Sequence, residues 1–92
     1  MQFAKNTSKM NINQDLQILI GKKISEIRLR NNQTQHDIDF LTGIDSGDIS
    51  KYENGKKNLT LKTLIKISMA LRVHPQELFN FEFDIEKYKI DQ

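Results

Sequence analysis

The spacing of apolar residues predicts helices along most of the chain. Between residues 15 and 30, apolar positions recur every third or fourth residue, with charged and polar side chains between them, which is typical of an amphipathic helix. We expect this helix to end at Asn31 and Asn32, because asparagine tolerates the left-handed conformation that a helix exit often requires. The same spacing returns between residues 60 and 71 with a broader apolar face, which predicts a helix at the centre of the core.

Two shorter helical patterns lie between these helices and flank a glycine. Thr34 and Asp37 form an N-cap and capping box for the first pattern, so that helix should begin there. Gly43 follows at the point where it should stop, because glycine adopts a positive φ without a side-chain clash. Asp45, with an acidic residue three positions later, then starts helix again. Two helices joined by so short a turn must cross steeply, which is the geometry of a helix-turn-helix.

The end of the chain changes from helical spacing to strict alternation. A short fifth helix is expected at Pro75, because proline suits a first helical position. Beyond it, apolar and polar residues alternate from residue 79 to residue 85, and a period of two is typical of a strand. In one interpretation this strand pairs with the same strand of a second chain across a two-fold axis, so that Phe81, Phe83 and Ile85 contribute to dimerisation. In the other, the aromatic residues fold back onto the helices as a cluster or extend the fifth helix.

These elements divide the chain into three parts. Residues 1–14 are polar and lack sustained periodicity, so we expect a flexible N-terminal arm. Residues 15–79 form one helical domain with its helix-turn-helix motif at 35–54, and residues 80–92 form a C-terminal tail that could serve dimerisation. The predicted fold is therefore all-α with five helices, either with or without a C-terminal dimerising strand.

Composition narrows the classes of function. The chain has 92 residues and no cysteine, so disulfides and a cysteine-based zinc site are excluded. It has neither an apolar run long enough to span a membrane nor a signal peptide, and we expect a soluble, cytoplasmic protein without a membrane partner. A formal net charge of +2 is only mildly basic. Any affinity for nucleic acid must then come from where the charges lie.

No arrangement of residues points to catalysis or to a cofactor. His74 has no acidic residue and no second histidine at the spacing that metal ligation or general base catalysis requires. Paired carboxylates, a nucleophile with its base and a phosphate-cradling loop are not visible either. We expect neither an enzyme nor a metal or cofactor site.

Short motifs occur in a fixed order through the helical domain. The matching residues are Ile20, Gly21, Ile24, Ile27, Arg28, Thr34, Gln35, Ile38, Thr42, Gly43, Ile44, Ile49, Ser50, Tyr52, Glu53, Asn54, Gly55, Leu61, Leu64, Ala70, Leu71, Val73, Glu77, Leu78 and Phe79. In this combination and register, the sequence resembles the Cro/CI-type helix-turn-helix family (the XRE family) of phage repressors and small bacterial regulators. The resemblance implies the lambda-repressor-like fold of DNA-binding domains.

The resemblance also implies which residues bind double-stranded DNA. The second helix of the motif, residues 46–53, would lie in the major groove, and we call it the reading helix. Its outward positions, the candidates for contact with base edges, are Ser46, Gly47, Ser50 and Lys51. A helix-capping or solvated surface role is the alternative for the serines, and a solvated face is the alternative for the lysine.

Other matched positions imply contacts that are independent of sequence. Gln35 matches a glutamine that grips a DNA phosphate at the start of the first motif helix. A loop that lies along the DNA backbone is matched by Lys56, Lys57 and Asn58. Arg28 and Glu53 match a structural ion pair that fixes the reading helix without touching bases.

Some residues depart from the family's pattern. Asp39 stands where the family has alanine and where the two motif helices pass closely, so its carboxylate must point outward or force the helices apart. Arg72 replaces a common glycine and is therefore expected at positive φ. Asp37, Asp45 and Asp48 place negative charge on the face meant to approach DNA, and lysines must outweigh it.

The resemblance implies a small transcriptional regulator, either a repressor or an operon controller. One such motif reads too few bases to be selective, so we expect a homodimer on a palindromic operator with half-sites about 34 Å apart. Controllers of restriction-modification operons and simple phage-type repressors are similar in size. The alternative is an antitoxin or another module that binds a protein partner through its aromatic tail and autoregulates through its helix-turn-helix.

Overall fold

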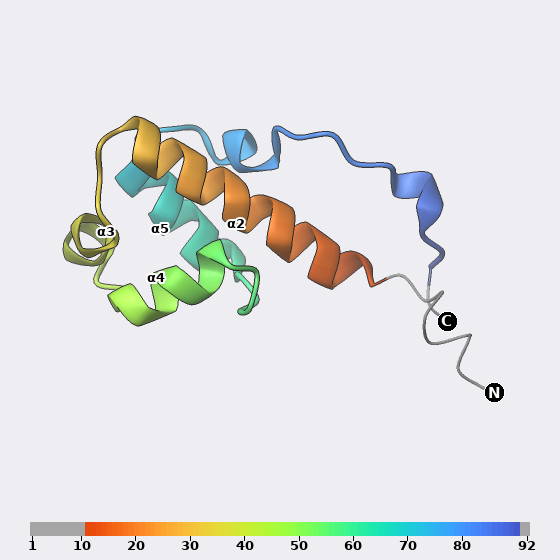
Figure 1. The fold of residues 1–92 in the computed structure, drawn as a ribbon, viewed down its shortest axis with the longest axis horizontal. Helices are drawn as coiled ribbons and strands as arrows, with labels where there is room; N and C mark the ends of the chain where they lie inside the picture. Colours follow the sequence, from red (N-terminus) through yellow and green to blue (C-terminus); the bar gives the residue numbers. More distant parts are fainter. Residues whose placement is uncertain (1–10, 91–92) are drawn as a thin grey trace.

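In the computed structural model, which describes residues 11–90, the chain is helical. The elements are α2 (Ile12–Arg30), α3 (Gln35–Thr42), α4 (Ser46–Glu53), α5 (Leu61–Leu71) and the 3₁₀ helices η1 (Pro75–Phe79) and η2 (Ile85–Lys87). Figure 1 shows α3, α4 and α5 gathered around α2, the longest helix. None of the helices in this range is both long and apolar enough to cross a membrane. The predicted all-α fold is confirmed.

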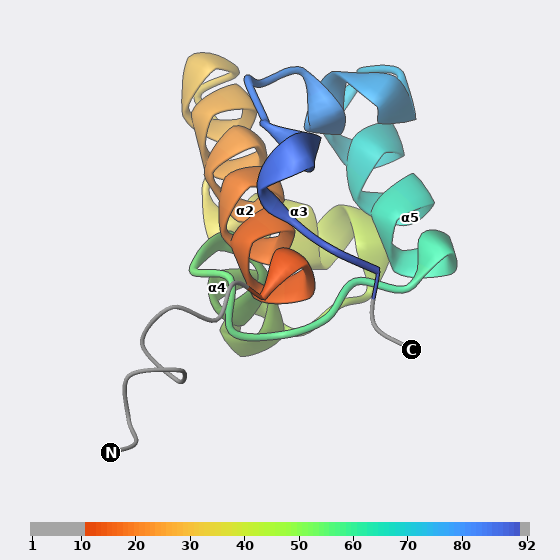
Figure 2. The ribbon, with the colours of Figure 1, turned by 90° about the vertical axis from the view of Figure 1, so that its right-hand side faces the viewer.

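Aliphatic side chains from five helical elements form one core. Ile24 of α2, Ile38 of α3, Ile49 of α4 and Ile67 of α5 are fully buried, and Leu78 of η1 joins them. Figure 2 looks along the molecule and shows α2 and α5 on opposite sides, with α4 below α2. The apolar stripes that predicted the helices are thus the faces that meet in the core.

A glycine allows α2 to lie directly against the end of α4. A Cβ atom at Gly21 would be 2.3 Å from the carbonyl oxygen of Tyr52 and 2.7 Å from that of Glu53. Because both neighbours are backbone atoms, they could not move aside without moving the helix. The C-terminal end of α4 is therefore seated on the middle of α2.

The helix ends carry the backbone conformations that the sequence predicts. Asn32 follows α2 with φ 58°, Gly43 ends α3 with φ 77°, and Arg72 ends α5 with φ 62°. The backbone of Arg72 lies in the left-handed region, where a residue with a side chain is strained. Its amide donates to the carbonyl oxygens of Met69 and Ser68, which closes the last turn of α5.

The first helix begins earlier than expected. α2 starts at Ile12, where the side chain of Asn11 accepts a hydrogen bond from the amide of Gln14 at 3.0 Å. Residues 12–14 therefore belong to the helix and not to an arm. The sequence pattern missed them because these positions are mostly polar and bury little surface. The remainder of the predicted arm, residues 1–10, lies outside the described residues.

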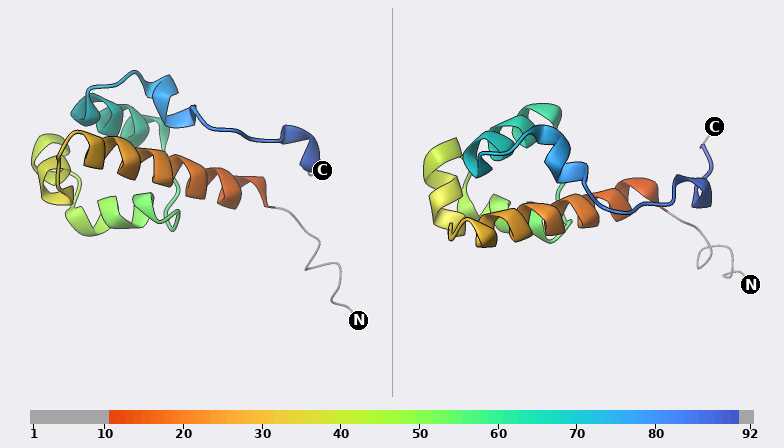
Figure 3. Two further views of the ribbon diagram at one scale, coloured as in Figure 1. Left: turned by 45° about the horizontal axis from the view of Figure 1, so that its top comes forward. Right: turned by 90° about the horizontal axis from the view of Figure 1, so that it is seen from above.

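The predicted C-terminal strand is absent from residues 11–90, and the fifth helix is a 3₁₀ helix instead of an α-helix. The tail runs alongside α2 toward its N-terminal end (Figure 3). Phe81 packs on the core, and the ring of Phe83 stacks on Tyr88 with centroids 5.2 Å apart. The strand prediction was wrong: Phe81 and Phe83 pack within their own chain, so the alternative of a folded-back cluster describes the tail.

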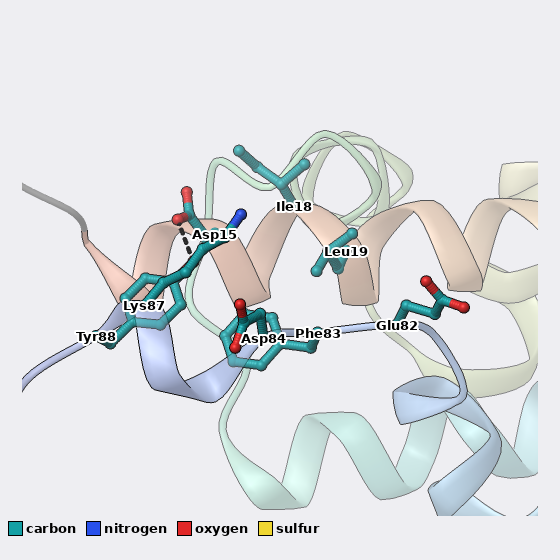
Figure 4. A pocket seen from close by; sticks show the side chains of 8 residues that line it. All are labelled: Asp15, Ile18, Leu19, Glu82, Phe83, Asp84, Lys87 and Tyr88. Carbon is teal, nitrogen blue, oxygen red and sulfur yellow. Dashed lines mark hydrogen bonds between the residues drawn. The ribbon is translucent and has the colours of Figure 1, made fainter.

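A hydrogen bond fastens the tail to the start of α2. The Tyr88 hydroxyl donates to Oδ2 of Asp15 at 2.6 Å, and this bond raises the pKa of the Tyr88 phenol. Figure 4 shows the bond beside a pocket of about 310 Å³ that Leu19 of α2 and Phe83 of the tail help to line. The tail is thus part of the folded unit up to Tyr88.

Candidate nucleic-acid interface

The helix-turn-helix begins with the capping box that the sequence predicts. The Thr34 hydroxyl accepts from the Asp37 amide at 3.0 Å, and the Asp37 carboxylate accepts from the Thr34 amide at 2.7 Å. After Gly43, the Asp45 carboxylate caps α4 by accepting from the Gly47 amide at 2.8 Å. These side-chain caps fix the residues at which α3 and α4 begin, and thereby which residues of α4 lie on its exposed face.

One carboxylate at the end of α4 joins three helices. Glu53 accepts two hydrogen bonds from Arg28 of α2, at 2.7 and 3.0 Å, and one from the side-chain amide of Gln35 on α3, at 3.1 Å. The side chains of Arg28 and Glu53 are only 11% and 6% exposed. The hydrogen bond with Glu53 raises the pKa of Arg28. The proposed structural pair and the proposed phosphate-binding glutamine therefore form one network.

The four base-reading candidates lie on the side of α4 that is not packed on the core. Gly47 and Lys51 are exposed, and Ser46 and Ser50 are partly buried. The opposite face of α4, which carries Ile49, is buried. The structure thus brings the four candidates together on one helix face.

The loop after α4 carries the predicted phosphate-binding residues Lys56, Lys57 and Asn58, and all three are exposed. Lys57 leans back toward α4, with Nζ 3.2 Å from a carboxylate oxygen of Asp48 and 5.6 Å from the centre of the Tyr52 ring. The Asp48 charge on α4 is therefore partly neutralised from the loop. Lys56 forms no such pair among the described contacts.

Asp39 behaves differently from both sequence expectations. It neither points away from α4 nor separates the helices, because Oδ2 accepts a hydrogen bond from the Ser46 amide at 2.9 Å. Sequence reasoning missed this contact, since it depends on the angle at which α3 and α4 cross.

The three dimerisation candidates of the tail lie in different surroundings. Phe81 and Phe83 are partly buried within their own chain, whereas Ile85 is 60% exposed. A second exposed apolar line, which the sequence analysis did not single out, follows the outer face of α5 at Leu61 and Met69, which are 73% and 72% exposed. The unusually broad apolar face of α5 was the signal that could have revealed it.

In the described part of the chain, no group of three or more histidine, cysteine, aspartate or glutamate side chains could hold a metal ion.

Comparisons with known proteins agree with this geometry. Residues 24–78 match the sequence model of a family described as helix-turn-helix. The control protein C.BamHI of Bacillus amyloliquefaciens is 35% identical over 68 residues, which cover 73% of this chain and 84% of that protein. The restriction-modification controller protein C.AhdI from Aeromonas hydrophila has a crystal structure that is 32% identical, with a TM-score of 0.67, and the match covers 71% of this chain and 97% of that chain.

A further solved structure contains DNA. It is the restriction-modification controller protein C.Esp1396I, a tetramer in complex with its natural 35-base-pair operator. It is 33% identical to the present chain, with a TM-score of 0.65, over 70% of this chain and 84% of that one.

Proposed function

Because the chain belongs to the helix-turn-helix family, we propose that it is a transcriptional regulator that binds a palindromic DNA operator as a homodimer. The observation that carries this proposal is that α4 is fixed to the rest of the domain through one face only. Its inner face is fixed to α2 by the contact at Gly21 and by the Arg28–Glu53 pair, while the opposite face is free for a major groove. Its relatives C.BamHI and C.AhdI are control proteins, which favours an operon controller.

The exposed face of α4 supplies the sequence-specific contacts in this proposal. Ser46, Gly47, Ser50 and Lys51 would meet base edges: the serine hydroxyls can donate or accept, the Lys51 ammonium can donate to acceptors such as guanine O6 and N7, and Gly47 lets the helix backbone approach closely. They share one face of a rigid helix, which is the arrangement that lets several side chains reach successive bases.

The surrounding backbone contacts would come from Gln35 and the loop residues Lys56, Lys57 and Asn58. Gln35 donates one side-chain hydrogen to Glu53, and its second hydrogen remains for a phosphate oxygen. Lys57 would exchange or share its Asp48 partner when a phosphate approaches. Phosphate contacts of this kind set the register on DNA and carry no sequence information.

The two-fold assembly is part of the proposal. One short reading helix covers few base pairs, whereas two on a dimer axis read a palindrome and multiply the selectivity. C.Esp1396I is a tetramer on its operator, which supports a multi-subunit complex here. The tail contribution through Phe81, Phe83 and Ile85 stays a prediction, although the strand that was to pair is absent.

In this proposal the chain is a DNA-binding regulator and not an enzyme, and we expect it to act in the cytoplasm. The alternative of an antitoxin needs a tail whose aromatic residues are free for a protein partner. Phe81 and Phe83 instead pack on their own chain, which leaves that alternative with less of the tail to offer a partner.

Selection of bound duplexes from a random pool tests the proposed function. We expect enrichment of a palindromic sequence with half-sites about 34 Å apart, centre to centre, which is one helical turn of DNA, or a multiple of that distance. Enrichment of a single, unrepeated half-site would remove the homodimer from the proposal. A pool that remains random after repeated rounds would contradict sequence-specific binding itself.

A further inference from the structure

The start of the reading helix α4 is held from outside the helix. The amide of Ser46, its first residue, donates to Oδ2 of Asp39, which lies on α3, seven residues earlier in the chain. Asp39 is partly buried. Its carboxylate therefore bridges the turn and binds one motif helix directly to the backbone of the other.

The remaining amides of the first turn of α4 are satisfied locally. The Gly47 amide donates to the Asp45 carboxylate at 2.8 Å, and the Asp48 amide donates to the Asp45 carbonyl oxygen at 2.9 Å. A helix leaves such amides without partners inside the helix, and here all three have acceptors in the protein. Asp39 supplies the acceptor that ties the position of α4 to α3.

Beside this bond, α3 and α4 are joined by apolar contacts and, at the far end of α4, by the hydrogen bond that Gln35 donates to Glu53 at 3.1 Å. Ile38 and Ile49 meet in the core, and apolar contacts of this kind allow small rotations and shifts. The turn is closed by Thr42, whose hydroxyl accepts from the Ile44 amide at 3.0 Å, before α4 begins. A charged acceptor at a helix N-terminus adds a short, oriented bond that also suits the helix dipole.

We propose that Asp39 is a positioning residue for base recognition. By holding the first amide of α4, it sets the angle at which Ser46, Gly47 and Ser50 face the major groove. The inference rests on the proposed function of α4. In this role the Asp39 carboxylate contributes to recognition, although its negative charge repels DNA phosphates.

A positioning role and a charge role predict opposite results. If Asp39 acts only through its charge, its removal should tighten binding to every duplex, because one repulsive charge is lost. If it positions α4, loss of the acceptor should weaken binding to the operator and leave random duplexes nearly unchanged. Binding to random duplexes depends mainly on phosphate contacts, whereas base contacts distinguish the operator from random duplexes.

The test measures dissociation constants for the selected operator and for a random duplex at one salt concentration. We expect Asp39→Ala to reduce the operator-to-random affinity ratio about tenfold, the size of effect that a charge-assisted hydrogen bond supports. Asp39→Asn should keep most of the ratio, because its amide oxygen can still accept from Ser46. Glu26→Ala is the control: it also removes one negative charge, from the exposed side of α2 away from the contacts of α4, and the ratio should stay unchanged.

Hydrogen exchange of the Ser46 amide gives a second readout on the free protein. It should quicken in Asp39→Ala and remain slow in Glu26→Ala, provided that circular dichroism shows both to be folded. An Asp39→Ala variant that binds both duplexes more tightly, with the operator-to-random ratio of the wild type, would overturn the positioning role. Asp39→Glu is the second variant if Asp39→Ala fails to fold: it keeps the charge but displaces the acceptor by one methylene, so the positioning role predicts a lower ratio and a charge role predicts unchanged affinities. A wild-type chain that binds no duplex selectively would instead overturn the proposed function, and this inference with it.

Discussion

At the scale of single residues, Glu53 is the most connected side chain of the interface. Its carboxylate holds Arg28 and Gln35 at distances between 2.7 and 3.1 Å while being 6% exposed. A charge so deeply placed is tolerated because it is paired and hydrogen-bonded. Glu53 therefore has two roles: its pair with Arg28 stabilises the fold, and its hydrogen bond with Gln35 fixes the position of the Gln35 side chain.

Substitution of Glu53 by alanine should be strongly destabilising. It leaves the Arg28 guanidinium mostly buried without its partner, and breaking such a pair costs about 3 kcal/mol. Urea unfolding measures this loss. Glu26→Ala is the control, because the Glu26 side chain is 67% exposed in its pair with Lys23 one helical turn away, and such a surface pair contributes less than about 1 kcal/mol. Equal losses in the two variants would show that the buried network has no special role.

At the scale of elements, α4 and the loop that follows it have different roles in the proposed DNA binding: α4 contacts bases and the loop contacts phosphates. α4 is rigid because it is capped at its start and seated on α2 at its end. The loop carries exposed positive charge beside it. A rigid helix suits the recognition of bases, whereas flexible lysine side chains suit phosphates, which are the same at every sequence.

Two lysine substitutions separate these roles. Lys51→Ala on α4 should change the sequence preferred in a selection from random duplexes. Lys56→Ala in the loop should weaken all duplexes about equally and reduce the slope of log affinity against log salt by about 0.9, the value for one lost phosphate contact. Each variant loses one positive charge and so serves as the other's control. If both changed only the salt slope, Lys51 would not be a base reader.

At the scale of the whole molecule, the tail closes the fold beside the N-terminal end of α2. The hydrogen bond from Tyr88 to Asp15 and the stacked Phe83 keep it there. Ile85, in contrast, remains 60% exposed. The packed part of the tail therefore belongs to the fold, while a role of Ile85 in dimerisation stays a prediction.

Deletion of residues 80–92 tests the dimerisation role of the tail. We expect the monomer–dimer equilibrium, measured by analytical ultracentrifugation, to shift toward the monomer, because Ile85 and its neighbours are lost. Ile85→Glu should shift it in the same direction without removing the contacts of Phe83 and Tyr88. An equilibrium that neither change moves would exclude the tail and leave the exposed line on α5 to be tested with Met69→Glu.

Much of this architecture could be predicted from the sequence, because the helices bury faces whose spacing is visible in the chain. The N-cap at Thr34 and the stop at Gly43 were predictable from local chemistry alone. The tail was not, since an alternation of apolar residues fits both a strand and an extended segment packed on a helix. The bond from Asp39 to Ser46 was not predictable either, because it depends on the crossing of two helices.

The most direct test of the central claim is to follow the backbone amides of the labelled protein by NMR while the selected operator is added. We predict that the largest shifts occur at Gln35, along the exposed face of α4 and at residues 56–58, with little change on the outer face of α5. Shifts confined to α5 or the tail, with α4 unchanged, would contradict the claim that α4 reads DNA.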